Sequence, residues 1–264
     1  MKDRILSHLP GNFPWQVHWF NTIDSTNTAA KAMAAEGAPH GTVLVAGHQT
    51  SGRGRMGREF VSPQGKGIYL SVILRPDCLP TQLMHLTCAA GVAMCNAVEA
   101  YCGYRPGIKW INDLIANGKK LGGILTELSV DPATAKVRYA VVGIGINCSQ
   151  RKEEFPESIR EIAVSLETAT GKAVAQDQLA AAMIQSLYQT DQALLGSKDS
   201  AMAQYRKDCI TLGQEVRILS QDAPAYGTAL DITDDGALTV QLPDGTLRLV
   251  NAGEVSLRGT DGYI

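Results

Sequence analysis

The sequence of residues 109–127 is KWINDLIANGKKLGGILTE, and it predicts a β-hairpin over residues 108–128. Asn117-Gly118 is the strongest short-range signal for a two-residue type I′ turn, because both central positions of that turn need positive φ. Strand geometry then sets the pairs across the hairpin. They are Ala116 with Lys119, Ile115 with Lys120, Leu114 with Leu121, and Asp113 with Gly122.

This hairpin brings an acidic and a basic side chain to one face. Strand periodicity puts Asp113, Ile115, Lys120 and Gly122 on that face. Asp113 and Lys120 become diagonal neighbours, about 7–8 Å apart at the backbone and within reach by side chain. Gly122 and Gly123 have no side chains, so a flat ligand can lie against the strand there. The alternative is a surface ion pair without function, worth about 0–1 kcal/mol.

A second chemical signal lies upstream, in the loop of residues 51–67. Arg53, Arg55 and Arg58 place three guanidinium groups within a short stretch, and guanidinium pairs bidentately with phosphate or carboxylate. The intervening glycines let the backbone approach a ligand closely. The loop is therefore a candidate flap over an anionic nucleotide. A solvated surface loop and a nucleic-acid-binding segment are the alternatives.

Residues 52–57 also match the GxGxxG pattern of dinucleotide-binding folds. That fold needs a helix directly after the last glycine, and Pro63, Gly65 and Gly67 oppose a helix there. A dinucleotide oxidoreductase is therefore the weaker interpretation. Gly143-Ile144-Gly145-Ile146-Asn147 ends another strand, where Asn147 is either a phosphate ligand or a plain turn residue.

The rest of the chain mixes helices and strands without strict βαβ alternation, which favours an α+β fold over a doubly wound sheet. Short strands and Asp-Gly turns after Cys209 predict a small all-β module, and we expect domains of residues 1–209 and 210–264. Strands are predicted at residues 17–23, 42–46, 68–74, 137–146, 214–219, 226–232, 237–242 and 247–251, and helices at residues 29–36, 82–101 and 179–195.

The composition is that of a globular protein. Of the 264 residues, 45% are hydrophobic and 19% are charged, with a net charge of −2, which argues against disorder and against a general polyanion-binding surface. The six cysteines form no CxxC pair, and we expect reduced, packed thiols. No uninterrupted apolar run reaches the roughly 20 residues of a membrane span, and no signal peptide is evident, so we expect a cytoplasmic protein.

Five motifs, in their order and spacing, resemble the biotin protein ligase family. They are Asp24-Ser25-Thr26-Asn27, Gln49-Thr50-Ser51-Gly52-Arg53-Gly54-Arg55-Met56-Gly57-Arg58, Lys109-Trp110-Ile111-Asn112-Asp113, Lys120-Leu121-Gly122-Gly123-Ile124-Leu125 and Gly143-Ile144-Gly145-Ile146-Asn147. The resemblance implies a class II synthetase-like catalytic domain, which is a mixed sheet with helices packed on it. It also implies a small SH3-like β-barrel at the C-terminus.

The resemblance further implies an ATP-dependent ligase that works in two steps. Biotin attacks the α-phosphate of ATP, giving biotinyl-5′-AMP and pyrophosphate, and a lysine of a biotin carboxyl carrier protein then attacks the mixed anhydride. The protein's tasks are to position anions and to neutralise charge. Mg²⁺ is expected with ATP, no dedicated metal site in the protein is expected, and a homodimer is a reasonable prior.

Individual residues take roles by the same resemblance. Biotin binding is implied for Ser25, Thr26, Asn27, Gln49, Arg53, Gly54, Arg55, Lys120, Gly122 and Gly123. Nucleotide binding is implied for Arg55, Arg58, Lys109, Asn112 and Asn147. Catalytic roles are implied for Arg55, Arg58, Asp113 and Lys120, with Lys120 at the reacting carboxyl and Asp113 positioning the carrier lysine. Trp110 is expected to pack or to shield the site.

The sequence departs from the family pattern in two places. Ile111 stands where the family commonly has proline, which removes no charged group. Residues 1–23 are too few for the helix-turn-helix repressor domain that some members carry, so DNA binding is not implied. Two further alternatives are a non-catalytic biotin-binding module and a lipoate or octanoate ligase.

Overall fold

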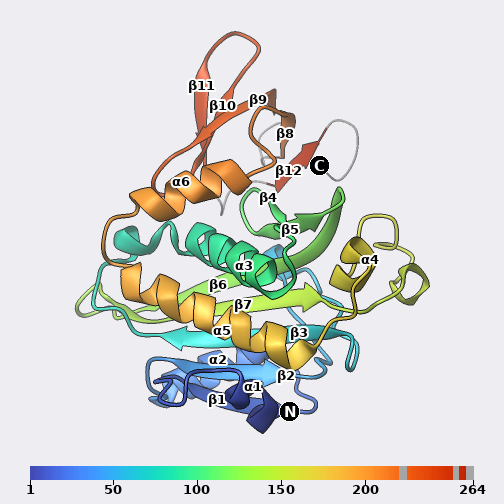
Figure 1. Cartoon of the computed structure of the whole chain (residues 1–264). Coiled ribbons are helices and arrows are strands. Elements are labelled where there is room, and N and C mark those ends of the chain that lie inside the picture. The colour runs from blue at the N-terminus through green and yellow to red at the C-terminus, as the bar shows by residue number, and fades with distance from the viewer. Residues whose placement is uncertain (220–224, 252–255, 260–264) are drawn as a thin grey trace.

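The computed structural model describes residues 1–219, 225–251 and 256–259. These residues form a mixed sheet flanked by helices and a separate, smaller antiparallel sheet (Figure 1). The predicted α+β class is therefore confirmed, and the small sheet is consistent with an SH3-like module.

The larger sheet has seven strands in the order β1-β2-β3-β7-β6-β5-β4. β1 pairs in parallel with β2, and the other neighbouring strands are antiparallel. A dinucleotide-binding fold needs successive parallel strands, so this topology excludes it. The strands are β1 (Gln16–Phe20), β2 (Thr42–Ala46), β3 (Gly67–Leu74), β4 (Gly107–Lys109), β5 (Asp113–Ala116), β6 (Lys119–Val130) and β7 (Val137–Asn147).

Helices cover both faces of this sheet, and its central strands are therefore buried on both sides. Leu44 of β2 and Ile73 of β3 pack under α2 (Thr26–Ala35), whereas Val43 and Val72 belong to the larger core beneath α3 (Leu86–Cys102) and α5 (Gln176–Ala193). The short helices are α1 (Lys2–Ser7), α4 (Leu166–Thr170) and α6 (Asp199–Asp208), with 3₁₀ turns η1 (Arg55–Gly57), η2 (Pro80–Leu83) and η3 (Lys152–Glu154).

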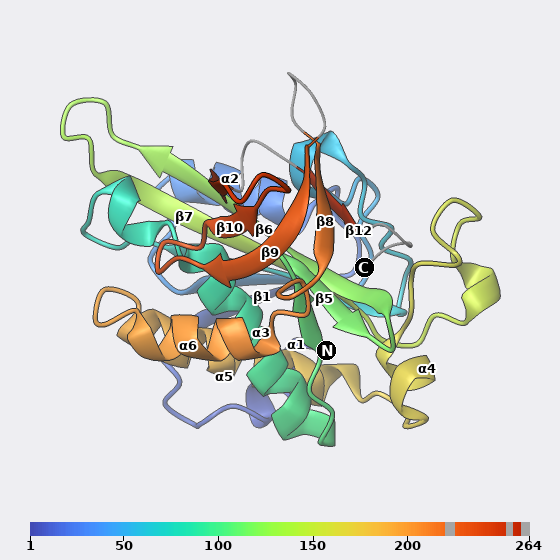
Figure 2. The same ribbon diagram turned by 90° about the horizontal axis from the view of Figure 1, so that it is seen from above.

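The smaller sheet has the strand order β11-β10-β9-β8-β12 and lies beside α6 and the β4–β5 end of the main sheet (Figures 1 and 2). A parallel bridge between Ile108 and Cys209 joins the two parts of the chain. The strands are β8 (Glu215–Leu219), β9 (Ala225–Ile232), β10 (Leu238–Gln241), β11 (Leu247–Val250) and β12 (Ser256–Gly259).

The β5–β6 hairpin confirms the predicted turn and corrects the predicted register. Asn117 and Gly118 have φ of 49° and 74°, and Ile115 pairs with Lys120 as predicted. A bulge then shifts the ladder, so that Asp113 faces Gly123 rather than Gly122, and Leu114 faces Gly122 rather than Leu121. The extra residue is Leu121, whose side chain is fully buried in the core. The bulge thus lets Leu121 pack inside while Lys120 still reaches Asp113.

One helical stretch, Pro80–Cys102, is long and apolar enough to cross a membrane by length and composition. Its apolar window is 72% buried within the fold, and α3 is a core helix of the larger cluster. The predicted helix at residues 82–101 begins four residues later than expected, because η2 precedes it. All six cysteines are free and five are buried, as expected for packed thiols.

We predict that Arg105→Ala lowers the free energy of unfolding by about 3 kcal/mol, because it leaves a buried carboxylate unpaired. Arg105 Nε donates to Asp208 Oδ1 over 2.7 Å, and the Asp208 side chain is only 6% exposed. Urea unfolding of the full chain measures the change. Lys136→Ala is the matched control, because its pair with Asp77 is exposed and contributes about 0–1 kcal/mol. Equal losses in the two variants would contradict the prediction.

Candidate active site

A cavity of about 360 Å³ opens between three parts of the fold. They are the β6–β7 part of the main sheet, the loop of residues 51–67 (the Gly/Arg loop) and the segment 155–163. The cavity brings together almost all of the residues that the sequence singled out. Those that line it are Ser25, Thr26, Asn27, Gln49, Arg53, Gly54, Arg55, Arg58, Lys109, Asn112, Asp113, Lys120, Gly123 and Asn147.

Gly122 is the candidate residue that does not line the cavity. A Cβ at Gly122 would lie 2.4 Å from the backbone oxygen of Gly145. Gly122 is therefore required because β7 approaches it closely. The bulge shifts the register by one residue, so that Gly123 instead of Gly122 faces the cavity. The predicted placement of Gly122 on the cavity-facing side of the strand is therefore corrected, and its contact with a ligand stays a prediction.

One end of the cavity is a neutral polar cluster fixed by hydrogen bonds. The backbone N and Oγ1 of Thr26 donate to Gln49 Oε1 over 2.8 and 3.1 Å. The Gln49 side chain in turn donates to Ser62 Oγ over 2.9 Å, and Ser71 Oγ lies 2.8 Å from Thr26 Oγ1. These bonds set the orientation of the Gln49 amide before any ligand enters.

Asn27 belongs to the same cluster and is tied to a charged network behind it. Asn27 Nδ2 donates to Glu127 Oε2 over 2.8 Å, and Lys31 Nζ lies 2.7 Å from Glu127 Oε1. Arg53 Nη2 lies 3.8 Å from the same oxygen. Burial raises the pKa of Glu127, but the bonds from Lys31 and Asn27 and the charges of Lys31 and Arg53 outweigh it, so the pKa is lowered overall.

The Gly/Arg loop forms a closed turn above the cavity. Gly54 N donates to Arg58 O over 2.7 Å, and Phe60 N donates to Gly52 O over 2.9 Å. Gly52 has no room for a side chain, because a Cβ would lie 2.2 Å from Phe60 O. No helix follows this loop, since residues 58–66 are described and non-helical.

The other end of the cavity is cationic. Arg55 Nη1 donates to Asn112 Oδ1 over 3.0 Å, and Lys120 Nζ lies 2.7 Å from Asp113 Oδ1. Lys109 is buried at the same end. Burial lowers the pKa of Arg55, against the opposing charge of Asp113. Arg55, Lys109 and Lys120 place guanidinium and ammonium groups at this end of the cavity, and such groups bind phosphate or carboxylate ligands.

The floor between the two ends consists of glycines on adjacent strands. Gly123 of β6 and Gly145 of β7 are register partners. A Cβ at Gly145 would lie 2.3 Å from the Phe60 ring, and one at Gly143 would lie 2.0 Å from Asn27 Oδ1. The glycines therefore admit Phe60 and Asn27 onto the sheet.

The segment 155–163 forms an apolar wall that the sequence analysis missed. Phe155, Ile159, Ile162 and Ala163 line the cavity. Lys120 N donates to Ile162 O over 2.7 Å, so the wall is attached to the residue that carries the ammonium group. The segment contains no α-helix, so helical periodicity gave no correct signal for it, and its apolar residues, Phe155, Ile159, Ile162 and Ala163, were the available signal.

Asn147 lies in the cavity wall with its amide already engaged. Its Nδ2 donates to Val164 O over 3.2 Å, and its Oδ1 accepts from Gln150 Nε2 over 3.3 Å. This geometry favours a structural role, tying β7 to the apolar wall, over the implied nucleotide contact.

A neutral polar end and a cationic end in one cavity suit a ligase that activates a carboxylate with a nucleotide, because the cationic groups can stabilise charge at the phosphate. Residues 19–147 match the biotin/lipoate A/B protein ligase family, and residues 211–258 match the biotin protein ligase C-terminal domain. The chain belongs to the biotin protein ligase family.

Individual relatives agree with this assignment. The chain is 34% identical over 237 residues to a biotin–[acetyl-CoA-carboxylase] ligase of Mycobacterium tuberculosis, covering 88% of this chain and 85% of that one. It is 35% identical over 238 residues to the bifunctional ligase/repressor BirA of Bacillus spizizenii, covering 88% and 71%. A solved structure of the Aquifex aeolicus biotin protein ligase in complex with biotin and ATP matches with a TM-score of 0.79 at 29% identity, covering 94% of this chain and 100% of that one.

We predict that the stabilising effect of Glu127 depends on pH. Because its folded pKa lies below the unfolded value, its contribution is present above the unfolded pKa of about 4.3 and is lost as pH falls through the folded value. The stability difference between the wild type and Glu127→Gln should therefore stay constant from pH 7 to about pH 5 and shrink as the pH falls below about 4.3 in chemical denaturation. A difference that shrinks only above about pH 5, or that stays constant or grows below about pH 4.3, would contradict this.

Proposed function

We propose that this chain activates biotin with ATP as biotinyl-5′-AMP and transfers the biotinyl group to a lysine of a biotin carboxyl carrier protein. The observation that carries the proposal is the two-ended cavity, with neutral hydrogen-bonding groups at one end and Arg55, Lys109 and Lys120 at the other. The Aquifex aeolicus ligase with biotin and ATP, and the Leishmania major ligase with biotinyl-5-AMP at 25% identity, support it.

The neutral end suits the uncharged ureido head of biotin. We propose that Ser25, Thr26, Asn27 and Gln49 bind this head, because they line the same end of the cavity and three of them, Ser25, Thr26 and Asn27, are buried there. A neutral polar cluster recognises a neutral polar group without the cost of burying an unpaired charge. Gly123 of β6, which lines the cavity, leaves room along the sheet for the acyl chain.

The cationic end suits the anionic reaction centre. We propose that Arg53, Gly54 and Arg55 surround the biotin carboxylate and the α-phosphate, while Arg58, Lys109 and Asn112 contact the nucleotide. Lys120 would neutralise the charge that develops when the biotin carboxylate oxygen attacks the α-phosphorus and pyrophosphate leaves. No covalent intermediate with the protein is required for this step.

Transfer needs a second group, and Asp113 is the acidic side chain beside Lys120. We propose that Asp113 positions the carrier lysine and accepts its proton as the nitrogen attacks the mixed anhydride and AMP leaves. ATP would enter as its magnesium complex. The described part of the chain contains no group of three or more His, Cys, Asp or Glu side chains able to hold a metal.

Other expectations also remain proposals. We propose a catalytic domain of residues 1–209 and an SH3-like domain of residues 210–264, supported by the two separate sheets. A cytoplasmic location, protein biotinylation as a post-translational modification, and a homodimer are proposed on the family resemblance alone.

We predict that Lys120→Ala reduces pyrophosphate release from biotin and ATP by about 100-fold or more, because a preorganised cation is lost at the developing charge. Arg55→Ala should also impair adenylate formation. Lys119→Ala is the matched control, because Lys119 lies next in the chain but does not line the cavity. Unchanged pyrophosphate release in Lys120→Ala would refute the role of this lysine.

Asp113→Ala should reduce transfer to the carrier domain more than it reduces adenylate formation, since only the second step requires its carboxylate. Mass measurement of a carrier domain after incubation with biotin and Mg-ATP reports the complete reaction. Single-turnover pyrophosphate release measures the first step separately. Equal losses in both steps would show that Asp113 acts before transfer.

Competition calorimetry separates the proposed ligase from a lipoate ligase. The polar cluster should bind biotin about 100-fold more tightly than lipoate, because the ureido group can exchange hydrogen bonds with these side chains, whereas the dithiolane ring of lipoate only removes their contact with water. Comparable affinities for the two ligands would favour lipoate chemistry. Biotin binding without any pyrophosphate release would favour a non-catalytic module.

A further inference from the structure

Trp110 lines the cavity, yet both of its nitrogens are bonded to the C-terminal part of the chain. Its indole Nε1 donates to Gly236 O over 2.9 Å, and its backbone N donates to Thr211 Oγ1 over 2.9 Å. The side chain is buried, with 6% of its surface exposed. The indole N–H is therefore directed at a backbone carbonyl of the β9–β10 turn.

The β9–β10 turn, residues 233–236, presents that carbonyl in a fixed position. Gly236 N donates to Thr233 O over 2.8 Å, and Ala237 N donates to Thr233 Oγ1 over 3.0 Å. Gly236 has a φ of 85°, and a Cβ there would lie 2.9 Å from Cys88 Sγ of α3. The turn is thus packed directly against the helix that covers the main sheet.

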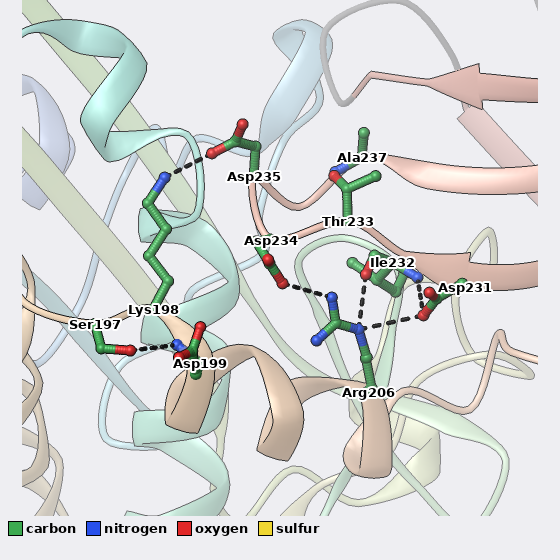
Figure 3. Close-up of polar contacts among 10 residues, drawn as sticks. All are labelled: Ser197, Lys198, Asp199, Arg206, Asp231, Ile232, Thr233, Asp234, Asp235 and Ala237. Carbon is green, nitrogen blue, oxygen red and sulfur yellow. Dashed lines mark hydrogen bonds and ion pairs between the residues drawn. The ribbon is translucent and has the colours of Figure 1, made fainter.

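Two basic residues hold this turn (Figure 3). Lys198 directly precedes α6, and Arg206 lies within it. Arg206 Nη2 donates to Asp234 Oδ1 and Arg206 Nε to Ile232 O, each over 2.7 Å. Lys198 Nζ lies 2.6 Å from Asp235 Oδ1. The same helix contacts the segment after Trp110, because Tyr205 Oη donates to Ile111 O over 3.1 Å.

In the sequence, Trp110 lies between two residues of the cationic end of the cavity. Lys109 directly precedes it, and Asn112 follows two residues later. Asn112 accepts from Arg55 Nη1, and its own Nδ2 donates to Ile124 O over 2.9 Å. The short segment from Trp110 to Asp113 is therefore fixed by the C-terminal module at one end and meets Arg55 at the other.

We propose that Trp110 is a positioning residue whose hydrogen bond to Gly236, in a turn held by Arg206 and Lys198, sets the placement of Asn112 and Arg55 for the nucleotide. This inference rests on the proposed function, since it assigns ATP to the end of the cavity that Asn112 and Arg55 occupy. The neutral cluster around Gln49 lies at the opposite end. Loss of the contact should therefore raise the KM for ATP more than it raises the Kd for biotin, whose ureido head is assigned to the neutral end.

The test compares Trp110→Phe, Arg206→Ala and the double variant in the full chain. Trp110→Phe keeps an apolar ring and removes the indole donor, whereas Arg206→Ala loosens the turn from a distance. Pyrophosphate release gives kcat and the KM for ATP, and calorimetry gives the Kd for biotin. Lys136→Ala, whose exposed pair with Asp77 lies outside this contact chain, is the control and should match the wild type.

Each single variant should raise the KM for ATP by about 5- to 10-fold, the loss expected for one hydrogen bond, while the biotin Kd changes less than about twofold. The double variant should be no worse than the more damaged single variant, because both changes act on the same contact. Multiplied effects in the double variant, an unchanged KM, or an equal loss of biotin binding would overturn the inference.

Folding and the proposed function are controlled separately. If Trp110→Phe fails to fold by circular dichroism, the cycle is run with Asp234→Asn and Arg206→Ala, with the same KM and Kd readouts. Absence of pyrophosphate release by the wild type would refute the proposed function itself. A wild type that is active, with variants unshifted in KM, would refute the positioning role alone.

Discussion

Lys120 is the residue on which the rest of the candidate site depends. Its ammonium lies 2.7 Å from Asp113 Oδ1 across the β5–β6 hairpin. Its backbone N donates to Ile162 O, and its backbone O accepts from Val164 N. One residue therefore joins the hairpin, the acidic partner and the apolar wall. The bulge at Leu121 makes this possible, because it lets two consecutive residues serve different sites. The Lys120 side chain lines the cavity, and the Leu121 side chain packs in the core.

The hairpin shows how far local sequence rules reach. Asn117-Gly118 predicted the turn, and the first two pairs beside it were right, because turn chemistry fixes nearby register. The bulge was not predictable from alternation, since burial of Leu121 is a tertiary effect. The predicted contact between Lys120 and Asp113 is observed although the predicted register was wrong. The long lysine side chain can span a shift of one position, whereas backbone pairs cannot.

In the rest of the chain, strands and helices were predicted correctly where the local sequence pattern is strong. Strands at residues 42–46 and 68–74 were predicted almost as observed, because they are continuous apolar runs. Helix α6 and the apolar wall of residues 155–163 were missed. In both segments apolar and polar residues are mixed, and their conformation comes from the surfaces they contact. Arg206 looks like an ordinary surface residue in the sequence, and only the folded chain places it against the β9–β10 turn.

The neutral end of the cavity has a thermodynamic consequence. Hydrogen bonds to Ser62, Ser71 and Glu127 fix the side-chain orientations of Thr26, Asn27 and Gln49. A ligand that enters this pocket therefore freezes few side-chain rotations, and little conformational entropy is lost on association. Preorganisation of this kind lets a small, uncharged head group be held tightly by a modest number of contacts.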